Sequence, residues 1–190
     1  MVSTARLSAP RRREVIARAA GQQFALRGYA GTTLDDIAAA AQVTKPIVYR
    51  HFESKQALYL ALLHKHEDDL TSFFTDADGV PVGVPVILDR WLDYVRENSH
   101  AWLMLFRDSS GDDEIRAVRR RVSLRAREVL AGFVGEQGVP AEQVQPSAEL
   151  LRSGLAGLAL WWIDHPAVPK QVVLEVALRV SQAALSSRRV

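Results

Sequence analysis

The sequence contains no cysteine, which removes several kinds of chemistry from consideration. Disulfide bonds, thiolate zinc sites and cysteine nucleophiles are excluded, and the absence fits a reducing compartment. Long apolar runs are also missing, since the longest, Gly154 to Ile163, is far shorter than the roughly 18 to 20 residues of a membrane span. No apolar signal core follows Arg6, so we expect a cytoplasmic protein.

Sequence motifs of common enzymes are absent as well. The chain has no Gly-x-Ser-x-Gly elbow, no His-Glu-x-x-His pair and no phosphate-binding glycine loop. We therefore expect neither an enzyme nor a protein with a cofactor or a metal. The 190 residues are 48% apolar, which is typical of a soluble globular protein with one large or two small domains.

Charge is nearly balanced overall but unevenly distributed. The net charge is +2, yet residues 1–55 carry nine Lys and Arg against four Asp and Glu, and residues 56–190 carry 15 against 18. A basic end attracts a polyanion through phosphate contacts and counterion release. The alternative is a basic terminus that is merely solvated.

Residues 31–55 contain the signals of two short helices joined by a tight turn. Thr33 occupies an N-cap position, and Asp36 three residues later completes a capping box. The first helix should therefore begin at about Leu34 and end at Gln42.

The second helix is predicted from Thr44, whose hydroxyl suits an N-cap, to Phe52. Pro46 lies in its first turn, where a backbone N–H would lack an intrahelical partner. Two short helices with this turn form a helix-turn-helix, whose second helix enters the major groove of DNA.

The second helix divides into an inner and an outer face. Val48 and Phe52, four residues apart, should pack inward. Lys45 and Arg50 are then free to reach phosphates or guanine edges, and the Tyr49 hydroxyl to reach a phosphate. The outward side chains are Lys45, Pro46, Ile47, Tyr49, Arg50 and His51.

Ser54 caps a third helix that starts with Lys55. A cation at a helix N-terminus meets the positive end of the helix dipole, which is unfavourable. A DNA phosphate between the two would remove this repulsion.

Residues from Val15 to about Leu63 resemble the DNA-binding region of the TetR/AcrR family of one-component transcriptional repressors. The resemblance rests on Phe24, Gly28-Tyr29, Thr32-Thr33, Asp36-Ile37-Ala38, Val43-Thr44-Lys45, Tyr49-Arg50-His51-Phe52, Lys55 and Leu58. It implies that the DNA-binding residues are Thr33, Thr44, Lys45, Pro46, Ile47, Tyr49, Arg50, His51 and Lys55.

One position departs from the family pattern. Gln42 stands where the family usually has glycine. Glycine adopts a positive φ at little cost, so glutamine at this position implies either mild strain or a slightly altered turn.

A helix should precede the helix-turn-helix, from Arg11-Arg12-Arg13 to about Arg27, with Gly28 as its stop. Together the three helices form one small DNA-binding domain, residues 1–55. The arginine run either reaches the minor groove or the DNA backbone, or stays a solvated tail.

The helix that starts at Lys55 is predicted to continue to near Asp78, which would connect the DNA-binding domain to the rest of the chain as a lever. His66 lies on its apolar stripe with carboxylates nearby. Two hypotheses follow, a metal site or a partly buried histidine, and the second is favoured.

Residues 56–190 are predicted to form a helical effector-binding and dimerisation domain, so the chain is all-α with about nine helices. Gly79 to Pro85 is a break before a helix that carries Trp91. The later helices are expected at about Ala101–Arg107, from Asp112 to about Gly135, at Ser147–His165 and at Pro169–Ser187. Arginines of the segment from Asp112 to about Gly135, Arg125 among them, face solvent beside acids or contact an anionic ligand or partner.

The last two helices are apolar on more than one face, for example at Trp161 and Val180. A second copy of the chain would cover the surplus and make a four-helix bundle, so we expect a homodimer. The two DNA-binding domains of the dimer would bind a roughly palindromic operator whose half-sites lie about 34 Å apart or a multiple of that spacing. The alternative is that these faces complete a monomer core.

The sequence thus predicts a ligand-responsive regulator, a repressor by its resemblance, that binds double-stranded operator DNA and is released by a small-molecule effector. Activation stays open because it depends on the operator's position, and a helical carrier or scaffold without DNA binding is the alternative. Large side chains with polar handles suit an effector pocket. The candidates are His66, Phe73, Trp91, Tyr94, Trp102, Phe106 and Trp161.

Overall fold

The computed structural model describes residues 8–74, 78, 82–107 and 110–185. These residues form nine α-helices, one short 3-10 helix and no strand, as expected for the all-α class. None of these helices is long and apolar enough to cross a membrane. The elements are α1 Ala9–Gly31, α2 Leu34–Ala40, α3 Lys45–His51, α4 Lys55–Thr71, η1 Ser72–Phe74, α5 Val84–Glu97, α6 Ser99–Phe106, α7 Asp113–Glu136, α8 Ala141–Asp164 and α9 Lys170–Leu185.

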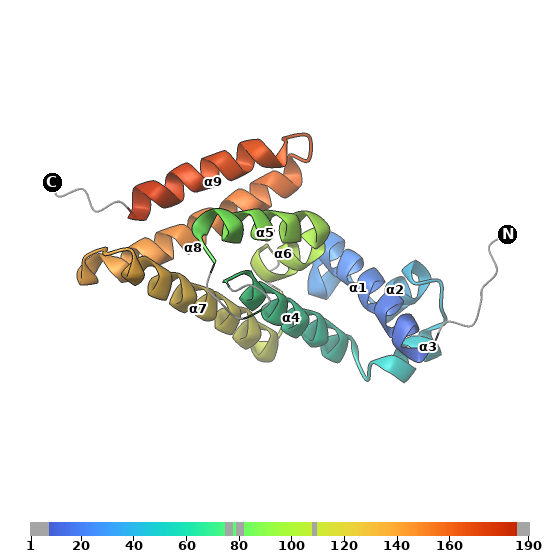
Figure 1. The fold of residues 1–190 in the computed structure, drawn as a ribbon. Helices are drawn as coiled ribbons and strands as arrows, with labels where there is room; N and C mark the ends of the chain where they lie inside the picture. The colour runs from blue at the N-terminus through green and yellow to red at the C-terminus, as the bar shows by residue number, and fades with distance from the viewer. Residues whose placement is uncertain (1–7, 75–77, 79–81, 108–109, 186–190) are drawn as a thin grey trace.

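Figure 1 shows the helices in two groups. Helices α1, α2 and α3 lie at one end of the molecule, which we call the head, and α5 to α9 form the body. Helix α4 runs from the head into the body, where it packs against α7. In the body, α7 packs against α8, and α9 packs against both α5 and α8.

Helix α1 buries a stripe of residues at helical spacing, Ile16, Ala20 and Phe24, all fully buried. Gly28 then interrupts the helix with φ 69° and ψ 172°, which confirms the predicted stop. The positive φ is open to glycine without a steric penalty. The Thr32 hydroxyl is 2.8 Å from the Gly28 carbonyl and donates to it, which holds the turn in place.

Helices α2 and α3 meet in the predicted turn. The capping box of α2 is present, with the Asp36 N–H 3.1 Å from the Thr33 hydroxyl and the Thr33 N–H 2.9 Å from the Asp36 carboxylate. Gln42 has φ 54°, so of the two alternatives the structure shows the left-handed conformation, which is strained for a residue with a Cβ. The turn is closed by backbone bonds, including one of 2.9 Å from the Val43 N–H to the Ala38 carbonyl.

Helix α4 is shorter than predicted, because it ends at Thr71 and not near Asp78. The Ser72 hydroxyl donates to the Asp69 carbonyl over 2.7 Å, and residues 72–74 tighten into a 3-10 turn. A serine that binds the preceding backbone in this way competes with the helical pattern, and 3-10 turns are frequent at helix ends. Residues 75–77 of the predicted helix lie outside the described residues.

Helix α8 is longer than predicted, because it starts at Ala141 and not at Ser147. Pro146 was expected to precede the helix but lies inside it. A proline there removes one N–H bond, the one to the Glu142 carbonyl. Glu142 is exposed, so its carbonyl is near water and the helix tolerates the proline close to its start.

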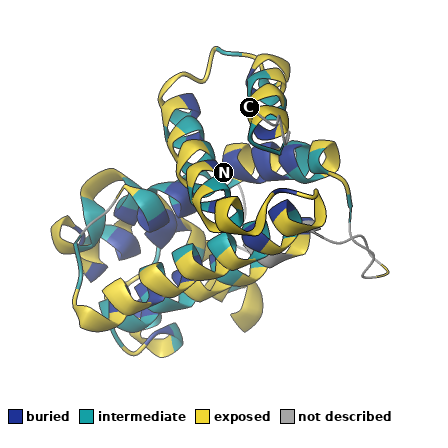
Figure 2. Ribbon diagram, turned by 90° about the vertical axis from the view of Figure 1, so that its left-hand side faces the viewer, coloured by how far each residue is buried: buried dark blue, intermediate teal, exposed yellow. Residues whose placement is uncertain are grey.

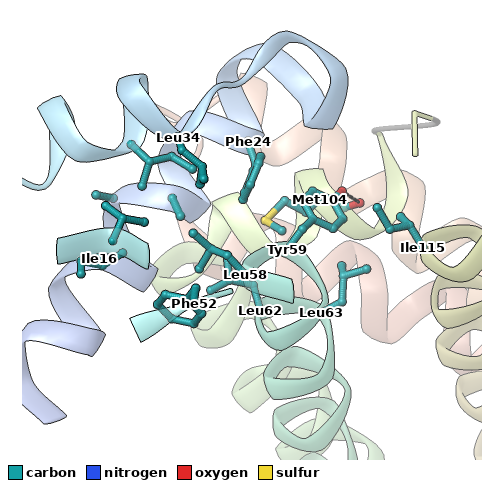
Figure 3. Packing of buried hydrophobic residues seen from close by; sticks show 14 of the residues in the cluster. Ile16, Phe24, Leu34, Phe52, Leu58, Tyr59, Leu62, Leu63, Met104 and Ile115 are labelled. Carbon is teal, nitrogen blue, oxygen red and sulfur yellow. Dashed lines mark hydrogen bonds between the residues drawn. The ribbon is translucent and has the colours of Figure 1, made fainter. Parts of the chain in front are cut away.

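One continuous core joins the head to the body. Figure 3 shows Phe24 of α1, Tyr59 of α4, Met104 of α6 and Ile115 of α7 packed side by side, and all four are fully buried. The Tyr59 ring meets Phe24 edge to face with centroids 4.7 Å apart. Buried residues run along the inner sides of the helices from the head into the body (Figure 2).

A close approach of α1 and α6 supports this junction. A Cβ atom on Gly21 of α1 would lie 2.4 Å from Cδ2 of His100 in α6, which is inside van der Waals contact. Glycine therefore allows the two helices to touch at this point. The head is held by packing on both α4 and α6.

The turn between α2 and α3 yields a stability prediction. Replacing Gln42 by glycine should raise the free energy of unfolding by up to about 1.5 kcal/mol. The left-handed conformation costs a residue with a Cβ roughly 1–2 kcal/mol, and the larger chain entropy of glycine in the unfolded state offsets roughly 0.5–1 kcal/mol of this gain. Urea denaturation of the two proteins measures the difference.

The matched control is Ala39→Gly, which places a glycine at an exposed position in the last turn of α2. It should lower the free energy of unfolding by up to about 1 kcal/mol, the difference in helix propensity between alanine and glycine. If both variants are destabilised equally, the turn at Gln42 carries no strain.

Candidate functional site

Helix α3 is fixed to the head from its inner side. Val48 is fully buried and Phe52, the residue after the helix, is 6% exposed, as the spacing predicted. Thr44 takes the N-cap position, but its hydroxyl makes no capping hydrogen bond. Pro46 lies in the first turn and is exposed. The start of α3 thus points an unused hydroxyl and an apolar ring outward.

The outer face of α3 carries the predicted polar groups. Tyr49 is 50% exposed, and Lys45 and Arg50 are exposed as well. Lys45 is not free, because its ammonium forms an ion pair of 2.8 Å with Asp35 of α2. Ile47 was expected on the outer surface, but it is half-buried and packs partly against the head core.

Lys55 is placed by internal contacts. Its ammonium donates to the carbonyls of Tyr29 at 2.8 Å and Thr32 at 3.0 Å, and lies 4.3 Å from the centre of the Tyr29 ring. Carbonyl oxygens and an aromatic face both attract a cation. The hypothesis that a DNA phosphate explains a lysine at this helix start is therefore unnecessary, and Lys55 ties α4 to the end of α1.

The arginine run next to α3 is partly bound to the head. The Arg13 guanidinium donates to the His51 carbonyl at 2.5 Å and lies 4.0 Å from the centre of the Phe52 ring. Burial lowers the pKa of His51, and the charges of Arg12, Arg13 and Arg50 lower it further. At neutral pH the imidazole is therefore uncharged, and the arginines provide the positive charge of this surface.

Thr33 lies beside α3, at the start of α2, and is exposed. Its hydroxyl is 2.6 Å from the Asp36 carboxylate, which Arg27 also binds at 2.8 Å. The hydrogen bond from Thr33 lowers the pKa of Asp36. All nine predicted DNA-binding residues therefore lie on α3 or at the two helix starts next to it.

A second feature of the molecule is a cavity in the body, of about 120 Å³. About 10–15 Å³ on this measure accommodates one water, so the cavity has room for an organic molecule. Four of the seven predicted effector residues line it: Phe73, Trp91, Trp102 and Phe106.

The other three predicted effector residues do not line the cavity. His66 is 2% exposed, and its Nδ1 is 2.6 Å from the Tyr94 hydroxyl. Burial lowers the pKa of His66 to about 4, so its ring is neutral, in line with the favoured hypothesis of a buried histidine. Trp161 is 45% exposed and stacks on His165 on the outside of α8.

Most of the cavity wall was not predicted. Helix α7 contributes a stripe at helical spacing, and α8 and α9 contribute further residues, because the helices enclose the space only after they have packed. The sequence shows the stripe of α7, but it does not show which helices pack opposite that stripe. The missed residues include Val122, Arg125, Ala126, Val129, Phe133, Leu151, Arg152, Leu155 and Ser181.

Helices α4 and α7 connect the cavity to the head. Near the head, Gln56 of α4 donates to Glu114 of α7 at 2.7 Å, and Arg119 of α7 donates to the Tyr59 hydroxyl. Near the cavity, Arg121 of α7 binds Glu67 of α4 at 3.2 Å. Val122 belongs both to the core shared with the head and to the cavity wall.

Comparisons with known proteins agree with this arrangement. Residues 16–62 match the family described as "Bacterial regulatory proteins, tetR family". The chain is 30% identical over 189 residues to the HTH-type transcriptional activator FasR of Mycolicibacterium smegmatis, a match that covers 95% of this chain and 86% of FasR. It is 32% identical over 164 residues to the HTH-type transcriptional repressor SCO4008 of Streptomyces coelicolor, which covers 83% of this chain and 81% of that protein.

A solved structure supports the fold. A TetR-like transcriptional regulator from Rhodococcus sp. RHA1 superposes with a TM-score of 0.80 at 20% sequence identity, covering 96% of this chain and 100% of that one. The sequence likeness to FasR extends over nearly the whole chain, head and body alike. The chain therefore belongs to the TetR family of bacterial transcriptional regulators and is not an enzyme.

Proposed function

We propose that the protein binds operator DNA through α3 and that a small molecule in the body cavity changes its affinity for the operator. The observation that supports this proposal is a hydrophobic core shared by the two sites. Val48, which anchors α3, and Val122, which lines the cavity, both belong to it. A protein that binds operator DNA works in the compartment that holds the DNA, which supports a cytoplasmic location.

The action of the effector requires a difference in affinity. A ligand releases the operator only if it binds more tightly to the conformation that does not fit DNA, since equal affinity would shift nothing. Phe106 lines the cavity and packs against the head core, and Glu67 lines it and is bound by Arg121. A ligand that displaces these side chains would move α4 and α7, and with them the head.

A homodimer is the second part of the proposal. Four large apolar side chains of α8 and α9 are exposed: Leu150 at 65%, Trp161 at 45%, Val172 at 49% and Val180 at 53%. An added Cβ on Gly154 or Gly157 would meet no atom within 4 Å, so α8 has room for a close neighbour there. A second copy on this face would bury the apolar side chains and present two heads.

Repression is the proposed default action. FasR is described as an activator and SCO4008 as a repressor, so the sign has to be measured for this protein. The first experiment is a fluorescence-anisotropy titration of the full chain with the intergenic DNA beside its own gene. A reporter fused to the bound promoter then gives the sign. Binding no tighter than to scrambled duplexes would refute operator recognition.

The exposed cation of α3 gives a salt-dependence prediction. If Arg50 contacts a phosphate, Arg50→Ala should lower operator affinity and reduce the slope of log K against log salt by about 0.9 per protomer. The titration is repeated over a range of salt concentrations. Arg120→Ala, which removes one exposed charge from α7, is the matched control and should leave the slope unchanged.

The Lys45–Asp35 pair gives a second prediction. If Lys45 reads bases, Lys45→Ala should cost about 1–3 kcal/mol on the operator and relax base preference. Asp35→Asn removes the carboxylate that holds the ammonium at 2.8 Å and should strengthen binding. Affinities for the operator and for single-base variants measure both effects. Weaker binding by Asp35→Asn would show that the pair itself positions Lys45.

The dimer surface gives a third prediction. Val180→Glu places a charge on the apolar face of α9, which should convert the dimer to a monomer because a buried unpaired charge is costly. Light scattering after gel filtration measures the mass. Leu26→Glu, at a position that is 75% exposed on α1, is the control and should stay dimeric. Retention of the dimer by Val180→Glu, with unchanged circular dichroism, would place the interface elsewhere.

A further inference from the structure

The chemistry of the cavity wall indicates which class of molecule it accepts. Sixteen of the twenty lining residues are apolar, and they include Trp91, Trp102, Phe106 and Phe133. Such a wall suits an apolar body, since aromatic rings offer large contact areas. The polar lining residues are Glu67, Arg125, Arg152 and Ser181.

Two of the three charged lining residues are already neutralised by neighbours. Arg121 binds the Glu67 carboxylate at 3.2 and 3.3 Å. Arg152 binds Glu149 at 2.5 and 3.0 Å, a contact that lowers the pKa of Glu149 to about 2. Each pair adds little net charge to the cavity.

Arg125 is the charged lining residue that remains. It is exposed, and within the described parts of the chain its guanidinium has neither an ion-pair nor a hydrogen-bond partner. It therefore lies where the cavity meets solvent and leaves one uncompensated positive charge there. A guanidinium is a rigid fork that suits carboxylate and phosphate oxygens.

Ser181 adds a neutral polar group to the cavity wall. Its side chain is 4% exposed and lines the cavity. A hydroxyl can donate a hydrogen bond to, or accept one from, a polar atom of a bound molecule.

We propose that the cavity takes an amphiphilic anion, an apolar chain that ends in one carboxylate or phosphate group. The chain lies against Trp91, Trp102 and Phe106, and the anionic group binds Arg125. The Ser181 hydroxyl, which lines the same cavity, donates a hydrogen bond to an oxygen of this anionic group. This inference rests on the proposed function, in which the cavity is the effector site.

The test compares four probes that share one alkyl chain: decanoate, decyl phosphate, decanol and decyltrimethylammonium. Isothermal calorimetry on the full chain gives the affinities, and tryptophan fluorescence reports occupancy because Trp91 and Trp102 line the cavity. The two anions should bind at least about tenfold more tightly than decanol, the ratio expected for one charge-assisted hydrogen bond, and the cation should bind most weakly. The preferred anion tells a carboxylate effector from a phosphate effector.

Arg125→Gln should weaken the binding of the anions about tenfold and leave decanol unchanged. Arg120→Gln, an exposed arginine on the same helix outside the cavity wall, is the control and should change neither. Ser181→Ala keeps the helix and should weaken the anions that use its hydroxyl. Circular dichroism of each variant checks the fold.

Three results would overturn the inference: equal affinity for decanoate and decanol, an affinity for the anions that Arg125→Gln leaves unchanged, or no binding of any probe. Operator binding is titrated in parallel without any probe. If the protein does not bind the operator in that titration, the proposed function is refuted. Calorimetry measures the charge preference of the cavity without DNA and therefore tests the inference separately.

Discussion

The packing of Tyr59 between the head and the body is the constraint on which the rest of the structure depends. Its ring lies against Phe24 of α1, its hydroxyl bonds the Met104 carbonyl of α6 at 3.3 Å, and Arg119 of α7 binds that same hydroxyl. A buried tyrosine contributes apolar contact through its ring, and the hydrogen bonds of its hydroxyl fix the orientation of the neighbouring helices. Because this one side chain of α4 meets three other helices, α1 cannot shift relative to α4 without disturbing the body.

The same junction explains how two distant sites share one molecule. Val48 anchors α3 on its inner side, whereas Lys45, Pro46, Tyr49 and Arg50 on its outer side are exposed. The cavity lies in the body and is lined mainly by residues of α5 to α9, with Glu67 of α4 at its wall, and α4 also packs on α1 of the head. Ion pairs and hydrogen bonds along these helices, such as Arg121 with Glu67, join the two ends. Coupling between sites needs a contiguous element of this kind with two arrangements.

Local signals predicted the head well because its elements are short and strongly marked. Thr33 and Asp36 set the start of α2, and Gly28 ends the regular part of α1, whereas the sequence left open whether Gln42 is strained, and its positive φ came from the structure. Predictions for helix ends in the body were less accurate. Helix α4 stops early at Ser72, and α8 runs through Pro146, because a single hydrogen bond or an exposed carbonyl decides such ends.

The sequence by itself determined the helical class, the helix-turn-helix and the outward side chains of α3, since capping and the 3.6-residue period act within one helix. Tertiary structure alone decided which residues enclose the cavity, that Trp161 faces outward and that Lys55 binds the carbonyls of Tyr29 and Thr32. An apolar residue in the sequence is equally suited to a core, a cavity wall or an interface. Only the packing of helices far apart in the chain assigns it to one of the three.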